Sequence, residues 1–225
     1  MIRENLQNIY KELPPDVKLV AVSKFHPVEA MLEAVDAGQL RFGENRPQEF
    51  QKKVLNFREQ HPEIAGRLEW HFIGHLQTNK LKMVLPYADL VQSIDSLHLL
   101  QAVDAWGKTA QKTVNVLLEL HIGAEQTKQG FVEEEALEIL FNASKYRNIR
   151  FRGLMGMASH TDNEDDIRAD FARISAFFGY CRDLFPELDG FSELSIGMSG
   201  DWRLALDYGA TMVRIGTAIF GPREY

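Results

Sequence analysis

Lys24 is the residue whose type and position point most directly to chemistry. It follows the apolar run of residues 19–23 and precedes Pro27, a pattern typical of a buried strand that leads into a helix. A lysine amine becomes a nucleophile when burial or neighbouring charge lowers its pKa, and it then forms Schiff bases with carbonyl compounds. The alternative is a strand-end lysine whose ammonium is simply hydrated. The rest of the chain favours the nucleophile.

Two glycine-rich turns near the C-terminus have the composition of an anion-binding site. Residues 195–200 precede a helix expected to open at Asp201, where backbone N–H groups point outward and glycine lets an anion approach them. Gly216 and Thr217 follow the next expected strand and add further donors. Each turn alone could be an ordinary connection. Together with Lys24 they favour a phosphorylated aldehyde as ligand, and pyridoxal 5′-phosphate is such a compound.

Arg214 lies between Val213 and Ile215 in an apolar segment, so its guanidinium must be paired or face a ligand. Donation to a pyridine nitrogen would keep that nitrogen unprotonated. The cofactor would then be a poorer electron sink, because protein groups near the ring set its electronics. The alternative is an ion pair with a carboxylate such as Asp207.

Other candidate chemistries lack their motifs. His71 and His75 are four residues apart on an expected strand and loop, so they lack the helical spacing of a metal-binding pair. Cys181 is the only cysteine, which leaves histidines such as His121 without cysteine partners for zinc and excludes an internal disulfide. No G-x-S-x-G, Walker or dinucleotide-binding motif is present. We therefore expect no metal site and no hydrolase nucleophile.

The composition is that of an ordinary soluble globular protein. The 225 residues are 45% hydrophobic and 25% charged, with a formal net charge of −7. This charge argues against nonspecific binding to nucleic acid or to anionic membranes. No apolar stretch is long enough to span a bilayer, and the first residues lack a secretory signal. With a single cysteine, we expect a cytoplasmic protein.

Strand and helix patterns alternate along the whole chain. An amphipathic helix is expected at the N-terminus, before the first strand. Among the later helices, one has Ala136, Leu137, Leu140 and Phe141 on its apolar face, and another opens at Thr161 with capping-box spacing. Each expected strand is a short apolar run that a turn ends: 17–23, 40–42, 69–73, 89–94, 114–120, 150–155, 192–196 and 211–215.

About eight strands alternating with helices in a chain of this length predict a (β/α)8 TIM barrel, as a single domain over residues 1–225 with an extra N-terminal helix. A doubly wound open sheet is the rival, since alternation alone cannot show closure. Active sites of such barrels lie at the C-terminal ends of the strands. The residues that follow the strands, and are therefore expected at that rim, are Lys24, Asn45, His71 to His75, Asp95, His121, Met157, residues 195–200, Gly216 and Thr217.

Several motifs together resemble the pyridoxal phosphate homeostasis proteins, the YggS/PROSC family. The resemblance covers nearly the whole chain, and that family is itself similar to the barrel domain of alanine racemase, the fold type III of pyridoxal phosphate proteins. The motifs that carry it are residues 20–24 (VAVSK), 42–45 (FGEN), 70–80 (WHFIGHLQTNK), 152–155 (RGLM), 197–199 (GMS) and 212–221 (MVRIGTAIFG).

The resemblance implies a role for each matching residue. Lys24 would carry the cofactor as a Schiff base, and Arg214 would face the pyridine nitrogen. The phosphate would be held by Ser199, Gly216 and Thr217. Asn45 and His71 lie on matching motifs and are expected near the cofactor. The sequence departs from many family members at Gly200 and Trp202, so the phosphate loop need not have their detailed shape.

The resemblance also implies a function without catalytic turnover: intracellular homeostasis of pyridoxal 5′-phosphate, with pyridoxal phosphate-dependent apoenzymes as candidate partners. Proton transfer at Cα requires a base on each face, and this sequence offers Lys24 and no evident second group. We therefore expect no catalytic residues. A monomer is expected as well, because the domain that would build a racemase-like dimer is absent. The alternatives are a pyridoxal phosphate-dependent amino acid racemase and a sugar-phosphate isomerase or aldolase barrel.

Overall fold

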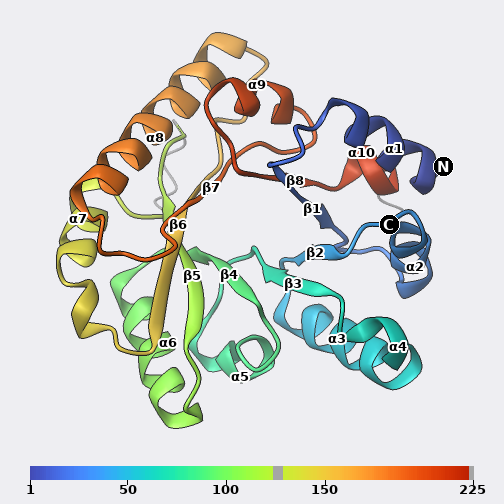
Figure 1. The fold of residues 1–225 in the computed structure, drawn as a ribbon, viewed down its shortest axis with the longest axis horizontal. Helices are drawn as coiled ribbons and strands as arrows, with labels where there is room; N and C mark the ends of the chain where they lie inside the picture. Colours follow the sequence, from blue (N-terminus) through green and yellow to red (C-terminus); the bar gives the residue numbers. More distant parts are fainter. Residues whose placement is uncertain (124–128, 223–225) are drawn as a thin grey trace.

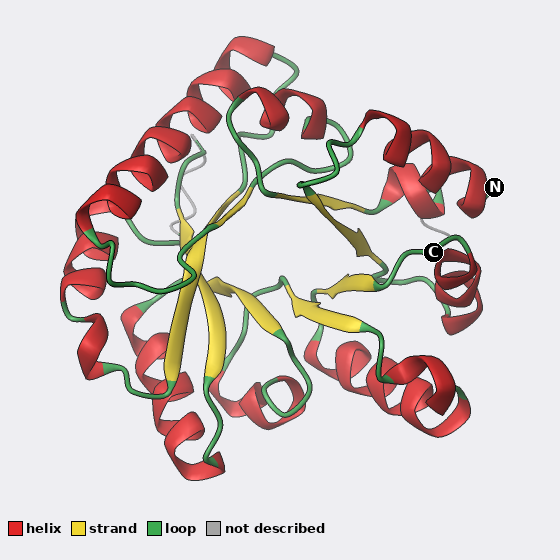
Figure 2. Cartoon of the chain, viewed as in Figure 1, coloured by secondary structure: helices red, strands yellow, loops and turns green. Residues whose placement is uncertain are grey.

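Over the described residues, eight strands close into one parallel barrel, with neighbours in sequence order from β1 to β8. The computed structural model describes residues 1–123 and 129–222. Closure is made by β1 and β8, whose residues Val20 and Arg214 are paired in register. The barrel expectation is thus confirmed, and the open sheet is wrong. Figure 1 shows the helices arranged around the strands, and Figure 2 shows the same ring by element type.

The strands are short, and each lies within about two residues of its sequence-based expectation. The strand β2 differs most, because it continues through Gly43 and Glu44. The bounds are β1 Lys18–Val22, β2 Arg41–Glu44, β3 Glu69–Phe72, β4 Leu90–Ile94, β5 Val114–Leu120, β6 Ile149–Gly156, β7 Glu193–Ser195 and β8 Met212–Ile215.

Helices follow the strands and cover the outside of the barrel. Two short 3₁₀ segments, Thr78–Lys80 and Ala143–Lys145, precede α5 and β6. The α-helices are α1 Ile2–Glu12, α2 Val28–Asp36, α3 Pro47–Gln60, α4 Pro62–Ala65, α5 Leu81–Val84, α6 Leu97–Ala110, α7 Glu133–Phe141, α8 Glu164–Leu184, α9 Trp202–Asp207 and α10 Thr217–Phe220.

Two helix expectations are wrong in detail. Phe141 ends α7 and is 65% exposed, while Ile139 is buried instead. The Phe141 ring lies at the helix terminus and makes an edge contact with Phe185, so it covers the core from its margin. The N-cap of α8 is Asn163, whose Oδ1 accepts from the Asp165 N–H at 3.1 Å. Thr161 lies two residues upstream of this cap.

The hydrophobic core has two parts, as expected for a barrel wrapped by helices. The larger part lies between the strands and the helices. The smaller part fills the barrel interior and consists of Val20, Leu90, Leu117, Met155 and Met212. Buried polar side chains, among them His71, Gln92, Ser195 and Arg214, also lie in the interior.

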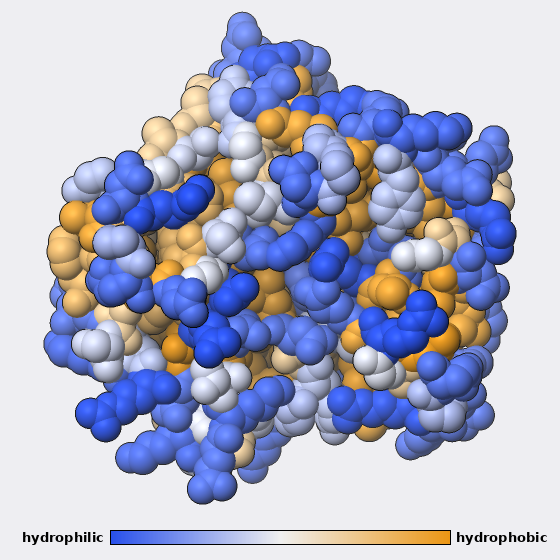
Figure 3. All heavy atoms as spheres, viewed as in Figure 1, coloured by the Kyte–Doolittle hydropathy of each residue, from blue (hydrophilic) through white to orange (hydrophobic). Residues whose placement is uncertain are grey.

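The N-terminal helix α1 closes the outer layer between α2 and α10 (Figure 1). Its buried residues are Ile2, Leu6 and Ile9, and the Asn5 amide donates to the Ile219 carbonyl at 2.9 Å. The face in Figure 3 is mainly hydrophilic. Over the described residues, we find no helix with the length and apolar character that crossing a bilayer requires.

Candidate functional site

Four strands that are consecutive around the barrel, β7, β8, β1 and β2, are followed by the candidate site residues Ser199, Gly216, Thr217, Lys24 and Asn45. Lys24 follows β1 after the buried Ser23 and is half-buried. Because Val22 pairs with Gly43, the turn that holds Lys24 lies beside Asn45 at the end of β2. On the other side of Lys24 lie the loops after β8 and β7. These loops occupy one sector of the rim.

The glycine-rich turns after β7 and β8 are joined by Ser199. Its hydroxyl oxygen accepts from the Gly216 N–H at 3.1 Å and from the Ala218 N–H at 3.5 Å. Thr217, which begins α10, is exposed beside them. Gly197 has a φ of +90°, and a Cβ there would lie 2.7 Å from the Ala205 Cβ. Glycine therefore lets this loop pack onto α9, and the two turns form one surface.

The helix after this loop starts later than expected. The expected opening at Asp201 is replaced by a start at Trp202, with Asp201 at the N-cap. The Asp201 side chain accepts from the Met198 N–H at 2.5 Å and so fixes the loop rather than the helix. The departure from the family at Gly200 and Trp202 thus falls at the junction of loop and helix.

Arg214 points into the barrel and binds neutral groups of two neighbouring strands. Its Nη1 donates to the Ser195 carbonyl at 2.8 Å and to the Ser195 hydroxyl at 2.7 Å, and its Nη2 donates to the Gly156 carbonyl at 2.9 Å. The alternative pairing with Asp207 is wrong, since that carboxylate is exposed and lies 3.7 Å from Arg168. Burial lowers the pKa of Arg214 to about 10, so it remains a cation at neutral pH.

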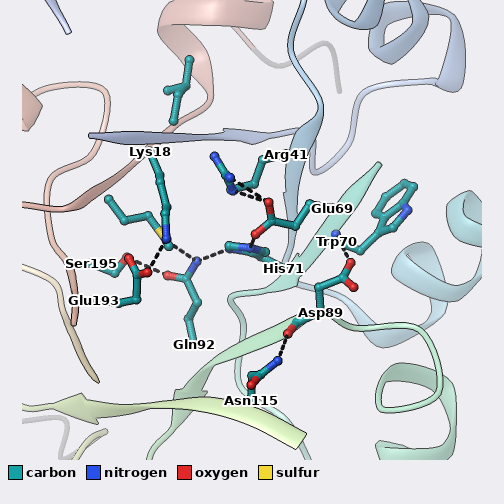
Figure 4. A network of polar contacts seen from close by, with 12 residues as sticks. Lys18, Arg41, Glu69, Trp70, His71, Asp89, Gln92, Asn115, Glu193 and Ser195 are labelled. Atoms are coloured by element: carbon teal, nitrogen blue, oxygen red, sulfur yellow. Dashed lines mark hydrogen bonds and ion pairs between the residues drawn. The ribbon is translucent and has the colours of Figure 1, made fainter. Parts of the chain in front are cut away.

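A chain of hydrogen bonds continues from Arg214 through the barrel interior, and most of it is seen in Figure 4. The Ser195 hydroxyl donates to Gln92 Oε1 at 2.7 Å, and Gln92 Nε2 lies 2.7 Å from His71 Nδ1. His71 Nε2 lies 2.8 Å from Glu69 Oε1. The Arg41 Nε then donates to Glu69 Oε2 at 2.8 Å.

The partners in this chain define the state of His71. The Gln92 amide is a donor toward Nδ1, so Nε2 carries the hydrogen and donates to Glu69. Burial lowers the pKa of His71, which keeps the ring neutral, although Glu69 opposes this shift. Burial also disfavours ionisation of Glu69, but hydrogen bonds from His71 and Arg41 dominate and lower its pKa to about 2.

His71 therefore lies below the rim rather than in it. Its side chain is completely buried, and both ring nitrogens are engaged by protein groups. His75 does lie at the rim, where its Nδ1 is 2.7 Å from Asp95 Oδ2. Within residues 1–123 and 129–222, no three metal-ligating side chains gather in one place.

Asn45 has a buried side-chain oxygen, Oδ1, that a bound ligand could satisfy. No described residue makes a hydrogen bond to its Oδ1. The backbone of Asn45 is packed closely, because a Cβ at Gly74 would lie 2.1 Å from the Asn45 carbonyl oxygen. A buried acceptor without a partner is unfavourable, so a hydroxyl or N–H group of a bound molecule would stabilise this position.

Sequence reasoning missed two interior residues, Gln92 and Glu119. Gln92 interrupts the apolar strand β4, and Glu119 is the only charged residue of β5. Burial and, secondly, Asp95 raise the pKa of Glu119 to about 7, while Arg214 and His75 oppose the shift. A polar residue inside a buried strand was the signal that could have identified both.

Comparisons with known proteins agree on one relationship. A family model described as the alanine racemase N-terminal domain matches residues 1–224. The pyridoxal phosphate homeostasis protein of Vibrio alginolyticus is 38% identical, over 100% of this chain and 98% of that protein. PipY of Synechococcus elongatus PCC7942, solved with PLP bound, has a TM-score of 0.88 at 33% identity and covers 98% of this chain and 100% of its own.

The fold is also similar to that of an enzyme with much lower sequence identity. An alanine racemase of Clostridium difficile 630 has a TM-score of 0.79 at 17% identity, over 100% of this chain and 57% of the racemase chain. At this identity the likeness shows a shared barrel and nothing of activity.

Proposed function

The chain belongs to the family of pyridoxal phosphate homeostasis proteins, and on this premise we propose that it binds pyridoxal 5′-phosphate at the C-terminal rim of its barrel. The observation that carries the proposal is the sequence of loops after β7, β8, β1 and β2. These loops hold two phosphate-compatible turns, a lysine and a buried orphan acceptor in one sector. PipY was solved with PLP bound, which supports the choice of ligand.

The phosphate is assigned to the joined turns. Ser199 and Thr217 supply hydroxyl donors, and the backbone of Gly216 allows a close approach, because glycine has no side chain. Loops after the last two strands are a common phosphate site in such barrels. The exposed position of Thr217 and the half-buried position of Ser199 leave both accessible from the mouth.

Lys24 is assigned the covalent contact. Its amine condenses with an aldehyde to form a C=N bond, and the aldehyde oxygen leaves as water with the two amine hydrogens. When bound, the cofactor supplies this aldehyde and an electron-withdrawing pyridine ring. Asn45, which directly follows the neighbouring strand β2, offers its Oδ1, unpartnered among the described residues, to a donor of the same ligand.

Arg214 is assigned to the pyridine nitrogen, with the hydrogen-bond chain below it as support. A guanidinium retains its hydrogens at neutral pH, so it donates to that nitrogen rather than protonating it. The ring is then a weak electron sink. His71 acts through Gln92 and Ser195, because its own nitrogens are already used. This arrangement suits holding the cofactor better than turnover.

The function is therefore homeostasis of pyridoxal 5′-phosphate, which the protein holds at this site. The relatives are named for homeostasis of this cofactor and not for an enzymatic reaction. The apoenzyme partners, a monomeric state, a single domain over residues 1–225 and a cytoplasmic location remain predictions from the sequence.

Titration with pyridoxal 5′-phosphate tests the proposal. We expect saturable uptake of one equivalent per chain, measured by visible absorbance after removal of free ligand. A protein that takes up none would contradict the proposal and favour an isomerase or aldolase barrel instead. Incubation of the loaded protein with L-alanine separates binding from turnover. Sustained formation of D-alanine would show a racemase, whereas we expect none.

A further inference from the structure

The turn that contains Lys24 rests on a buried cluster of charged side chains outside the barrel. At its centre is Lys53 of α3, which is only 5% exposed. Its Nζ donates to the Ser23 carbonyl at 2.8 Å, to Glu44 Oε1 at 2.7 Å and to Glu49 Oε1 at 2.8 Å. An ammonium has three hydrogens, so these three acceptors use all of them.

The cluster contacts both peptide groups that flank Lys24. The Ser23 carbonyl, bound by Lys53, belongs to the peptide before Lys24. The Phe25 N–H, which donates to Glu49 Oε1 at 2.8 Å, belongs to the peptide after it. The Ser23 hydroxyl also donates to Glu44 Oε1 at 2.6 Å. The peptide group before Lys24 is thus bound by Lys53 and the one after it by Glu49, while Glu44 binds the Ser23 side chain and Lys53 joins the two carboxylates.

The backbone of this turn is strained. Phe25 has a φ of +68°, and only one other described residue that is not glycine has a positive φ. Such a conformation is unfavourable for a phenylalanine and persists only where its surroundings enforce it. Here the enforcing contacts are the Glu49 hydrogen bond and the Arg46 guanidinium, which lies 4.4 Å from the centre of the Phe25 ring.

Stability alone does not account for the cluster. Glu44 is completely buried, and no described residue makes a hydrogen bond to its Oε2. Burial raises the pKa of Glu44, and Lys53 opposes this shift. Buried ion pairs are often no more stabilising than apolar residues of similar size, but they specify geometry when they fix one arrangement. In this cluster the geometry that is fixed is that of the Lys24 turn.

We infer that Lys53 is a positioning residue for Lys24: together with Glu44 and Glu49, it sets the backbone from which the Lys24 amine reaches the barrel mouth. This inference rests on the proposed covalent role of Lys24. It predicts that loss of the cluster slows bond formation at Lys24 while leaving the phosphate turns intact, because those turns follow β7 and β8 and, among the described residues, make no hydrogen bond with Lys53.

The test compares Lys53→Met with Lys52→Met, a matched control on the neighbouring exposed position of the same helix. Two quantities are measured for each protein. The first is the rate constant for covalent addition of pyridoxal 5′-phosphate to Lys24, followed by absorbance and by borohydride trapping. The second is the dissociation constant of pyridoxine 5′-phosphate, which has the ring and phosphate but no aldehyde.

We expect Lys53→Met to slow covalent addition about 10- to 100-fold, the scale of effect of a misplaced reacting group. Its affinity for pyridoxine 5′-phosphate should be unchanged, and Lys53→Arg should recover part of the rate. Lys52→Met should match the wild type. Equal rates in Lys53→Met and wild type would overturn the inference, and so would a loss of affinity that accounts for the whole rate effect.

A second variant keeps the test decisive if Lys53→Met does not fold by circular dichroism. Glu49→Ala removes the acceptor of the Phe25 N–H at a site that is partly exposed, and Glu29→Ala on α2 is its control. A wild-type rate in Glu49→Ala would then overturn the inference. Failure of the proposed function looks different: the wild type itself would form no adduct on Lys24.

Discussion

The two sides of the candidate site are supported by buried polar groups of different kinds. Below Lys24, the cluster of Lys53, Glu44 and Glu49 has three formal charges and binds backbone atoms. Below Arg214, the chain through Ser195, Gln92 and His71 is neutral between its charged ends and binds a side chain. The first support fixes where a chain segment runs. The second fixes where one guanidinium points.

This difference predicts how much stability the protein loses when a residue of either support is substituted. A buried charge that loses its partner is strongly destabilising, whereas a neutral hydrogen-bonding group that loses its partner costs less. The Lys53 cluster should therefore be sensitive to removal of a single charge. Loss of one neutral residue from the middle of the Arg214 hydrogen-bond chain should reduce the stability less.

Lys53→Met should give the largest loss of stability. It leaves the buried Glu44 carboxylate without its cation, and breaking such a pair costs about 3–5 kcal/mol of unfolding free energy. Denaturant unfolding at pH 7 measures the change, with Lys52→Met expected near the wild-type value. A loss no greater than that of the control would show that the cluster is not held by charge.

Glu119 should introduce a pH dependence on the Arg214 side. Its pKa rises from 4.5 to about 7 on folding, because burial and Asp95 outweigh the attraction of Arg214 and His75. The folded state thus binds the proton more tightly. Its contribution to stability is complete below pH 4.5 and is lost as the pH rises through about 7.

Glu119→Gln should remove this dependence. At about 1.4 kcal/mol per pH unit, the variant should gain about 3 kcal/mol relative to wild type between pH 4.5 and pH 8. Urea unfolding at several pH values measures the difference. Parallel stability curves for the two proteins would contradict the assigned proton uptake.

Ser199→Ala probes the phosphate turns, which neither buried cluster supports. Losing a hydrogen bond to a charged ligand should cost about 1.5–3 kcal/mol, a rise of about 10- to 150-fold in the dissociation constant of pyridoxal 5′-phosphate. Ser192→Ala, at an exposed serine beside β7, serves as the control. An unchanged constant in Ser199→Ala would refute the assigned phosphate contact.

Gln92→Leu should have the smallest effect of the set. It leaves His71 Nδ1 without its donor, at a cost of about 1–3 kcal/mol in unfolding free energy, whereas the Ser195 hydroxyl keeps the hydrogen bond that it accepts from Arg214. Gln101→Leu on the surface of α6 is the matched control. If Gln92→Leu costs more than Lys53→Met, the contrast between the two supports is wrong.

The fold was largely predictable because its strands are short apolar runs that glycine and proline turns end. The apolar run 114–120 predicted both ends of β5 correctly. The predicted barrel is confirmed by the closed sheet, in which the strands are neighbours in sequence order. Periodicity was less informative at helix ends. It predicted a buried Phe141, since it gives the angle of a residue around the helix but not how far the core extends along it.

The sequence predicted the site residues at the rim of the barrel but not the buried side chains that support them. Lys24, Ser199 and Gly216 follow strands, so their approximate location came from the barrel alone. The supports depend on contacts between distant parts of the chain, such as Ser195 with Gln92, which are 103 residues apart. Lys53 lies three residues after Phe50 on the apolar face of α3, but a helical lysine usually extends to water. Only the structure shows that it is buried.

The central claim is that Lys24 holds pyridoxal 5′-phosphate covalently, and the visible absorbance of the purified protein tests it most directly. Wild type and Lys24→Ala are compared with and without added pyridoxal 5′-phosphate, followed by borohydride reduction and peptide mass mapping. We predict a Schiff-base band in the wild type alone and a reduced pyridoxyl group on Lys24. A colourless wild type that takes up no pyridoxal 5′-phosphate, or an adduct on another lysine, would contradict the account.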